Sequence, residues 1–267
     1  MFKNRVLPAA GIVVVTIGCI LLCRVTRVLF FTVLAVMSAY EMREILKNIG
    51  TAFPMQVPAV YIVAQGALCF FRAPVAWMIA LMGAAAFAAM LLGILYPTKI
   101  GGRGAEAALS GLLWPFAFYA VVLYASASDA WLSVLTIGVL GVWACDSAAL
   151  SGGRAFGEKK VAPLVSPNKT WAGCYCGAAA SLLAGVIFYF LLRSFGGPGL
   201  VTCVVTSLVA TTAGQIGDLA ASLVKRMCNV KDFSNLIPEH GGILDKTDSM
   251  LFAIPTAYLC LRIAGAA

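Results

Sequence analysis

The stretch PVAWMIALMGAAAFAAMLLGILY, residues 74–96, carries no charged side chain and is followed directly by Pro97. A transmembrane α-helix needs about 20 consecutive, mainly apolar residues to cross the hydrocarbon core of a bilayer. Proline lacks a backbone N–H group and fits poorly inside a helix, so Pro97 marks the end of this one. The stretch is therefore predicted to form a transmembrane helix.

Eight further apolar runs accompany it, and together they determine the predicted fold class. The chain is 61% hydrophobic and 11% charged, with a mean hydropathy of +0.95, which excludes a soluble domain. The sequence predicts an all-α, polytopic helical integral membrane protein with about nine transmembrane helices, the fifth kinked at Pro115. The first run is interpreted as an uncleaved helix because no A-x-A-like site follows it. The other eight runs are residues 7–23, 28–40, 58–71, 105–125, 131–150, 171–192, 199–224 and 249–264.

The polar segments between these runs divide the chain and orient it. Residues 1–130 hold the first five predicted spans, and residues 131–267 hold the last four together with two polar loops. Fourteen of the 19 Lys and Arg residues fall on the side of the N-terminus and both polar loops, and five fall on the other side. Because cytoplasmic loops are enriched in Lys and Arg, this side is predicted to be cytoplasmic, at the inner membrane if the protein is bacterial. The net charge of +8 suits an anionic membrane surface or anionic substrates and does not require nucleic acid.

Nine cysteines are scattered through the chain, and none of them forms a C-x-x-C pair. An odd number without such a pair argues against a disulfide framework and against a zinc site. We interpret the cysteines as small apolar core residues.

The segment SLVKRMCNVKDFSNLIPEHGGILDKTD, residues 222–248, differs from the rest of the chain because charged and polar side chains are concentrated in it. Asp218 lies just upstream, in an apolar run where a carboxylate is costly and therefore indicates function. If the helix that contains Asp218 continues through Arg226, then Asp218, Ser222 and Lys225 lie on one face of it. That face would run from inside the membrane to its cytoplasmic edge.

Two more carboxylates, Asp245 and Asp248, share a face of the last helix if that helix begins near Asp245. Three carboxylates converging among cations favour a magnesium site, because Mg²⁺ takes one or two carboxylates together with substrate phosphates and water. Basic side chains would neutralise the remaining phosphate charge. The candidates for that role are Lys225, Arg226, Lys231 and Lys246.

His240, Gly241 and Gly242 predict a sharp turn between these elements. Glycine allows the backbone to approach a ligand closely, so the amides of Gly241 and Gly242 could bind an anion. His240 is either an acid–base residue or the donor of a hydrogen bond that stabilises the turn. Phosphoryl transfer through a loose transition state needs little proton transfer, which leaves both interpretations open.

Simpler interpretations exist for the other charged residues of this segment. Asp245 and Asp248 could cap the last helix at its N-terminus. Lys225 and Arg226 could be ordinary interfacial anchors. The concentration of all these residues in one segment near Asp218 favours the functional interpretation.

The second polar loop contains SPNKTWAG, residues 166–173, at the start of the seventh predicted helix. The free amides of a helix N-terminus, with Ser166, Lys169 and Thr170, could bind phosphate. A capped helix start with an interfacial tryptophan is the alternative. Asp146, at the end of the sixth run, is either a further metal ligand or a salt-bridge partner of Arg154 or Lys169.

Four blocks carry a resemblance to a known family. The pattern S-L-V-K-R-x4-K-D-x-S-x2-I-P-x-H-G-G-I-x-D-K-T-D closely resembles the signature of the phosphatidate cytidylyltransferases, also called CDP-diacylglycerol synthases. DSAALSGGR at residues 146–154, SPNKTWAG at 166–173 and GQIGDL at 214–219 resemble further blocks of the family, in its order. The chain departs from the family pattern at Lys246, Ala172 and Ala221, where the family usually has arginine and two acidic residues.

The resemblance implies an enzyme that joins CTP to phosphatidic acid and releases CDP-diacylglycerol and pyrophosphate. It implies dependence on Mg²⁺, with a second, monovalent cation as a further expectation, and a homodimer in the lipid bilayer. It makes Lys225, Arg226, His240 and Lys246 the expected catalytic residues.

Two other functions remain open from the sequence. A CTP-dependent lipid kinase of the polyprenol type would transfer the γ-phosphate and release CDP, and the full signature disfavours it. A transporter would use Asp218 and Asp146 as ion sites, but the inverted repeats or paired broken helices typical of transporters are not found in the sequence.

Overall fold

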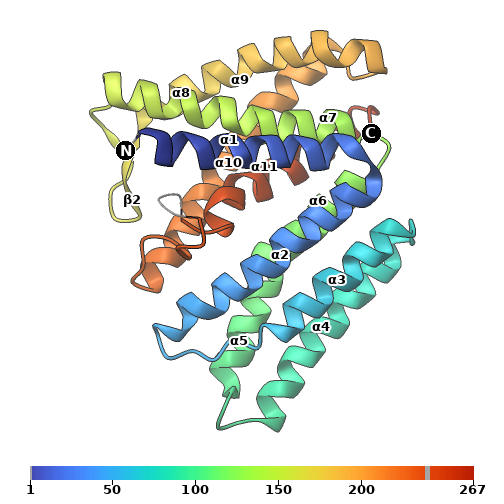
Figure 1. The fold of residues 1–267 in the computed structure, drawn as a ribbon, viewed down its shortest axis with the longest axis vertical. Helices are drawn as coiled ribbons and strands as arrows, with labels where there is room; N and C mark the ends of the chain where they lie inside the picture. Colours follow the sequence, from blue (N-terminus) through green and yellow to red (C-terminus); the bar gives the residue numbers. More distant parts are fainter. Residues whose placement is uncertain (1, 238–240) are drawn as a thin grey trace. The chain divides into compact units, whose positions relative to one another are not determined.

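A computed structural model describes residues 2–237 and 241–267, and the side chains of residue 11 and of those from residue 13 onward. The described chain is helical apart from one two-stranded antiparallel sheet (Figure 1). It forms two compact units: residues 1–127 with 227–246, and residues 128–226 with 247–267. The predicted all-α fold class is confirmed.

The first unit contains α1 (Phe2–Leu22), α2 (Arg24–Lys47), α3 (Gln56–Phe70), α4 (Val75–Leu95), α5 (Gly101–Gly111), η1 (Leu112–Phe116) and α6 (Ala117–Ala127). Helices α3 and α4 lie side by side, and α2 packs on both α3 and α6 (Figure 1). Its core is mainly apolar but also holds buried polar groups, among them Ser38 and Tyr119, whose hydroxyls are 2.8 Å apart. The predicted kink at Pro115 is confirmed: Trp114 has φ −141° and ψ 125°, because proline excludes the helical conformation from the residue before it.

The second unit contains α7 (Trp131–Leu135), η2 (Thr136–Leu140), α8 (Gly141–Phe156), β1 (Lys160–Ala162), β2 (Ser166–Thr170), α9 (Trp171–Leu192), η3 (Arg193–Phe195) and α10 (Leu200–Met227). It also includes the part of α11 (Leu244–Ile263) that follows residue 246. Small residues bring these helices together: a Cβ added to Gly185 of α9 would lie 2.6 Å from Val204 Cα. Close approach of backbones at glycine is typical of membrane helices, where dispersion rather than water exclusion drives packing.

The polar segment between the predicted spans 131–150 and 171–192 is only partly a loop. Helix α8 continues to Phe156, and β1 pairs antiparallel with β2, with Lys160 opposite Thr170. A short hairpin satisfies the backbone hydrogen bonds of this polar segment. It therefore places residues 166–170 on an ordered strand.

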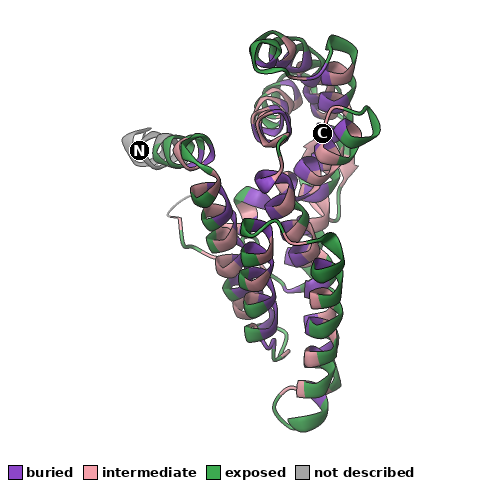
Figure 2. Ribbon diagram, turned by 90° about the vertical axis from the view of Figure 1, so that its right-hand side faces the viewer, coloured by how far each residue is buried: buried purple, intermediate pink, exposed green. Residues whose placement is uncertain are grey.

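Helices form at all nine predicted positions, but the number of spans is not confirmed as nine. Among the described residues, six helices are long and apolar enough to cross a membrane: α2, α4, α5–α6, α7–α8, α9 with η3, and α10. Shorter apolar helices occur at Val13–Leu22 and Gln56–Phe70. Trp77 and Phe87 of α4 are exposed apolar side chains, as expected of a surface that faces lipid. Figure 2 colours the ribbon by the burial of each residue.

Candidate functional site

An ion pair between α10 and the hairpin lies at the centre of the candidate site in the second unit. Lys169 Nζ of β2 is 2.8 Å from Asp218 Oδ2 of α10, and it also donates to the carbonyl of Gln215 at 3.0 Å. The side chains of Lys169 and Asp218 are 22% and 34% exposed, so solvent reaches both. Asp146 lies on α8 next to Cys145, whose Sγ accepts a hydrogen bond from Gln215 Nε2 of α10 at 3.1 Å, so α8 meets α10 near this ion pair. Both roles predicted for Asp146, metal ligand and salt-bridge partner of Arg154 or Lys169, stay predictions.

The predicted helical face of α10 is confirmed, because α10 remains helical through Met227. Ser222 Oγ lies 3.5 Å from Asp218 Oδ1, and Ser222 and Lys225 are buried. Arg226 is exposed, and its Nε donates to the carbonyl of Val165 in the hairpin turn at 3.3 Å. Asp218, Ser222 and Lys225 therefore follow one another toward the polar end of this helix.

Thr170 joins the hairpin to α9 and caps that helix. Its hydroxyl accepts from Gly173 N at 3.2 Å, and the side chain is buried. Thr170 therefore caps the start of α9, which was the alternative interpretation of this segment from the sequence. The phosphate-binding role of Ser166 and Thr170 stays a prediction.

In the first unit, Asp245 organises the turn that precedes and opens α11. Its Oδ2 accepts from Phe233 N at 2.8 Å and from Gly242 N at 2.9 Å. Gly241 has φ +83°, a conformation that disfavours a side chain, and a Cβ there would lie 2.9 Å from Asp245 Oδ2. The amide of Gly242 donates to the carboxylate of Asp245 in this structure, and its role in binding a substrate anion stays a prediction.

Glu41 is a functional candidate that the sequence analysis missed. It lies on α2 and is 1% exposed. Its Oε1 accepts from Ser234 Oγ and Ile243 N, both at 2.7 Å, and its Oε2 accepts from Leu244 N at 2.8 Å. An acidic residue at the end of an apolar run resembles an ordinary interfacial charge, and nothing in the sequence signals a contact across about 200 residues.

The remaining predicted residues are placed as follows. Asp248 is buried, its Oδ1 is 2.6 Å from Ser249 N, and its carbonyl oxygen faces Gly217 of α10. Lys231 and Lys246 are exposed, and His240 lies outside the described residues. Within residues 2–237 and 241–267, no three His, Cys, Asp or Glu side chains come together as a metal-binding group. The metal assignment of Asp218, Asp245 and Asp248 stays a prediction.

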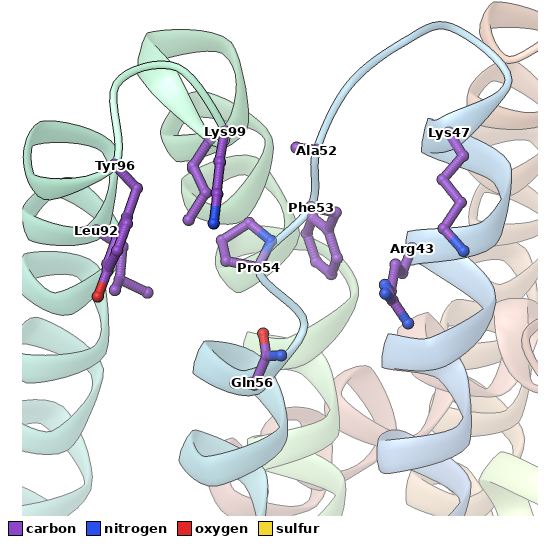
Figure 3. A pocket seen from close by; sticks show the side chains of 10 residues that line it. Arg43, Lys47, Ala52, Phe53, Pro54, Gln56, Leu92, Tyr96 and Lys99 are labelled. Carbon is purple, nitrogen blue, oxygen red and sulfur yellow. The ribbon is translucent and has the colours of Figure 1, made fainter.

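A cavity of about 600 Å³ lies in the first unit, and three of its lining side chains are Arg43, Lys47 and Lys99 (Figure 3). Its other lining residues are apolar or uncharged, among them Phe53 and Tyr96. A site lined by cations without a carboxylate does not suit a divalent cation. The cavity is therefore separate from the predicted metal ligands, none of which lines it.

The fold and the charged side chains define a helical integral membrane protein with a carboxylate–lysine cluster on α8, β2 and α10. The model of the Cytidylyltransferase family matches residues 3–264, and the chain belongs to this family. It is 45% identical over 118 residues to the phosphatidate cytidylyltransferase of Brucella suis, covering 44% of this chain and 43% of that protein. It is 33% identical over 180 residues to the protein of that name from Pseudomonas aeruginosa, covering 66% of each. The Brucella alignment spans less than half of that relative. The predicted family resemblance is confirmed.

Proposed function

We propose that this protein is a phosphatidate cytidylyltransferase, which transfers the cytidylyl group of CTP to phosphatidic acid. The observation that carries the proposal is the cluster of Asp146, Lys169 and Asp218 in a membrane protein of the Cytidylyltransferase family. A lipid substrate and a triphosphate require a charged site at the edge of the bilayer. These side chains lie on helices long and apolar enough to span it and on the adjoining hairpin.

In the proposed reaction, a phosphate oxygen of phosphatidic acid attacks the α-phosphorus of CTP. The new P–O bond gives CDP-diacylglycerol, and the bond to the β-phosphate breaks, so that pyrophosphate leaves with its electron pair. Phosphoryl-type transfer depends mainly on positioning and on neutralising charge. The protein contributes by binding and orienting two anionic substrates.

Two of the predicted metal ligands fit Mg²⁺. Asp146 and Asp218 carry carboxylate oxygens, the donors that Mg²⁺ prefers, and solvent reaches both side chains. Mg²⁺ bound there would neutralise phosphate charge and polarise the phosphorus. Asp245 and Asp248 remain proposed ligands, although Oδ2 of Asp245 is already engaged by two backbone amides.

The basic residues are proposed to bind phosphate oxygens. Lys169 is held between Asp218 and the carbonyl of Gln215, so its ammonium group has a defined position from which to contact the triphosphate. Proposed further contacts are Ser166, Thr170, Ser222, Lys225, Arg226, Lys231, Lys246, His240, Gly241 and Gly242. The proposal also includes a homodimer, and it includes no nucleic-acid partner.

The experiment that tests the function uses purified protein with labelled CTP, phosphatidic acid and Mg²⁺. We expect CDP-diacylglycerol and pyrophosphate in equal amounts, and no turnover in excess chelator. Release of CDP with a phosphorylated lipid would identify a lipid kinase instead. Full turnover without any divalent cation would refute the metal assignment.

We propose that the N-terminus and both polar loops face the cytoplasm, on the basis of the 14-to-5 distribution of Lys and Arg. A cysteine introduced at Lys159, an exposed position before β1, is expected to react with an impermeant maleimide only from the cytoplasmic side. The parent chain, which has nine cysteines of its own, is the control. Labelling of the introduced cysteine from the opposite side would reverse the topology.

Lys225 and Arg226 are proposed to bind phosphate rather than only to anchor α10. An anchor needs positive charge alone, whereas a phosphate site needs particular donors, for which Lys and Arg are not interchangeable. Lys225→Arg and Arg226→Lys keep the net charge, and at least one is expected to lose about tenfold in kcat/KM, or roughly 1.4 kcal/mol. Parental kinetics in both variants would leave these residues with an anchoring role.

A further inference from the structure

The turn that opens α11 is held by a residue from a distant helix. Glu41 of α2 accepts three hydrogen bonds from this segment, one from the hydroxyl of Ser234 and two from the backbone amides of Ile243 and Leu244. Both carboxylate oxygens are used. Leu244 N is the first amide of α11 and Ile243 N directly precedes it, where a helix offers no acceptor of its own.

Because Glu41 is buried, its three hydrogen bonds matter more than they would at the surface. A carboxylate removed from water is costly unless hydrogen bonds replace its hydration, and here three donors lie at 2.7–2.8 Å. The negative charge also lies at the positive end of the α11 dipole, which adds to the attraction. The fit is close, because a Cβ on Gly242 would overlap the carboxylate of Glu41.

The same segment has two further points of attachment. Phe233 is buried, with its ring centroid 6.5 Å from that of Trp114. Asp245 ties Phe233 N to Gly242 N. Asp245 therefore links two parts of the segment, and Phe233 packs it against Trp114. Glu41 instead connects the first turn of α11 to α2.

We propose that Glu41 is a positioning residue, which fixes the backbone at Ile243 and Leu244, where α11 begins, and thereby places Asp245. The inference rests on the proposed function, since Asp245 is a proposed metal ligand. It assigns a role in the reaction to the N-terminal half of the chain, outside the signature. Glu41 does this without contacting substrate.

Glu41→Gln is the sharpest variant because it keeps the size of the side chain. An amide has one acceptor oxygen, and its NH₂ group would face a hydroxyl or backbone donor, so at least one of the three bonds is lost. Glu44→Gln is the matched control: it lies one turn further along α2 and pairs with Lys47 at 2.6 Å on the exposed side. Ser234→Ala is a graded variant, since it removes one donor and leaves both backbone bonds in place.

Hydrogen exchange provides a readout that does not depend on turnover. In Glu41→Gln, the amides of Ile243 and Leu244 are expected to exchange at least about tenfold faster than in the parent. Kinetics provide the second readout: kcat/KM is expected to fall about tenfold or more, and the Mg²⁺ concentration for half-maximal rate is expected to rise. Glu44→Gln is expected to match the parent in both, and Ser234→Ala to stay within about threefold in kcat/KM.

The outcomes separate this inference from the proposed function. If the parent makes no CDP-diacylglycerol, the proposed function fails, and hydrogen exchange still decides whether Glu41 holds the turn. If Glu41→Gln lowers only Tm and leaves exchange, kcat/KM and Mg²⁺ dependence at parental values, Glu41 has no positioning role. Equal effects of Glu44→Gln and Glu41→Gln would also overturn the inference, because they would reflect net charge alone.

Discussion

Asp218→Asn is expected to reduce turnover to below about 1% of the parent, a loss of roughly 2.7 kcal/mol or more in transition-state stabilisation. The substitution keeps the shape of the side chain and removes the charge that pairs with Lys169 at 2.8 Å. A neutral amide would hold neither Lys169 nor a divalent cation as firmly. The measurement is the rate of CDP-diacylglycerol formation at saturating Mg²⁺.

Expression and membrane insertion of this variant are expected to stay near normal. Both partners of the pair are partly exposed, and such ion pairs contribute about 0–1 kcal/mol to stability. Glu158→Gln, which removes an exposed carboxylate near the hairpin, is the control and should retain parental activity. Substantial turnover by Asp218→Asn would exclude Asp218 as a metal ligand.

Gly217→Val is expected to have the largest effect on stability. Gly217 lies where α10 meets α11, and a Cβ at this position would be 2.6 Å from Phe252 Cδ2 and 2.7 Å from the Asp248 carbonyl. The helices would have to separate, and overpacking of this kind costs about 1–3 kcal/mol. In a chain of this length we expect Tm in detergent to fall by about 5 °C or more.

Gly83→Val provides the matched comparison. Gly83 lies on α4, where an added Cβ would meet nothing within 4 Å. A valine there is expected to leave Tm within about 2 °C of the parent, since surface substitutions usually change stability by less than 0.5 kcal/mol. Similar losses in both variants would mean that helix propensity, and not contact with α11, explains the result.

The helices could be predicted because their cause is local. A long apolar run, such as residues 74–96, needs no partner elsewhere in the sequence to become a helix in a bilayer. The kink at Trp114 follows from the next residue, and the shared face of Asp218 and Ser222 follows from helical spacing alone. Each of these features depends on neighbours within a few positions.

What could not be predicted depends on distant contacts. The hairpin of β1 and β2 has no apolar alternation, so its polar residues resemble a loop. Asp245 was predicted as a metal ligand or a cap, whereas its use by Phe233 N depends on how the turn closes. Glu41 is the extreme case, because its three donors, in Ser234, Ile243 and Leu244, lie about 200 positions further along the chain.

The contact between Glu41 and the start of α11 also bears on how the protein is made. The ribosome completes α2 long before residues 234–244 emerge, so during most of synthesis the carboxylate lacks the three donors that later satisfy it. Contacts between segments so far apart in sequence form late, because the intervening chain must first be ordered. An N-terminal fragment that ends before residue 234 would keep this uncompensated acid in its helical bundle. An ionised carboxylate is costly to bury without such donors, so the environment of Glu41 reaches its final form only when the last helix has been made.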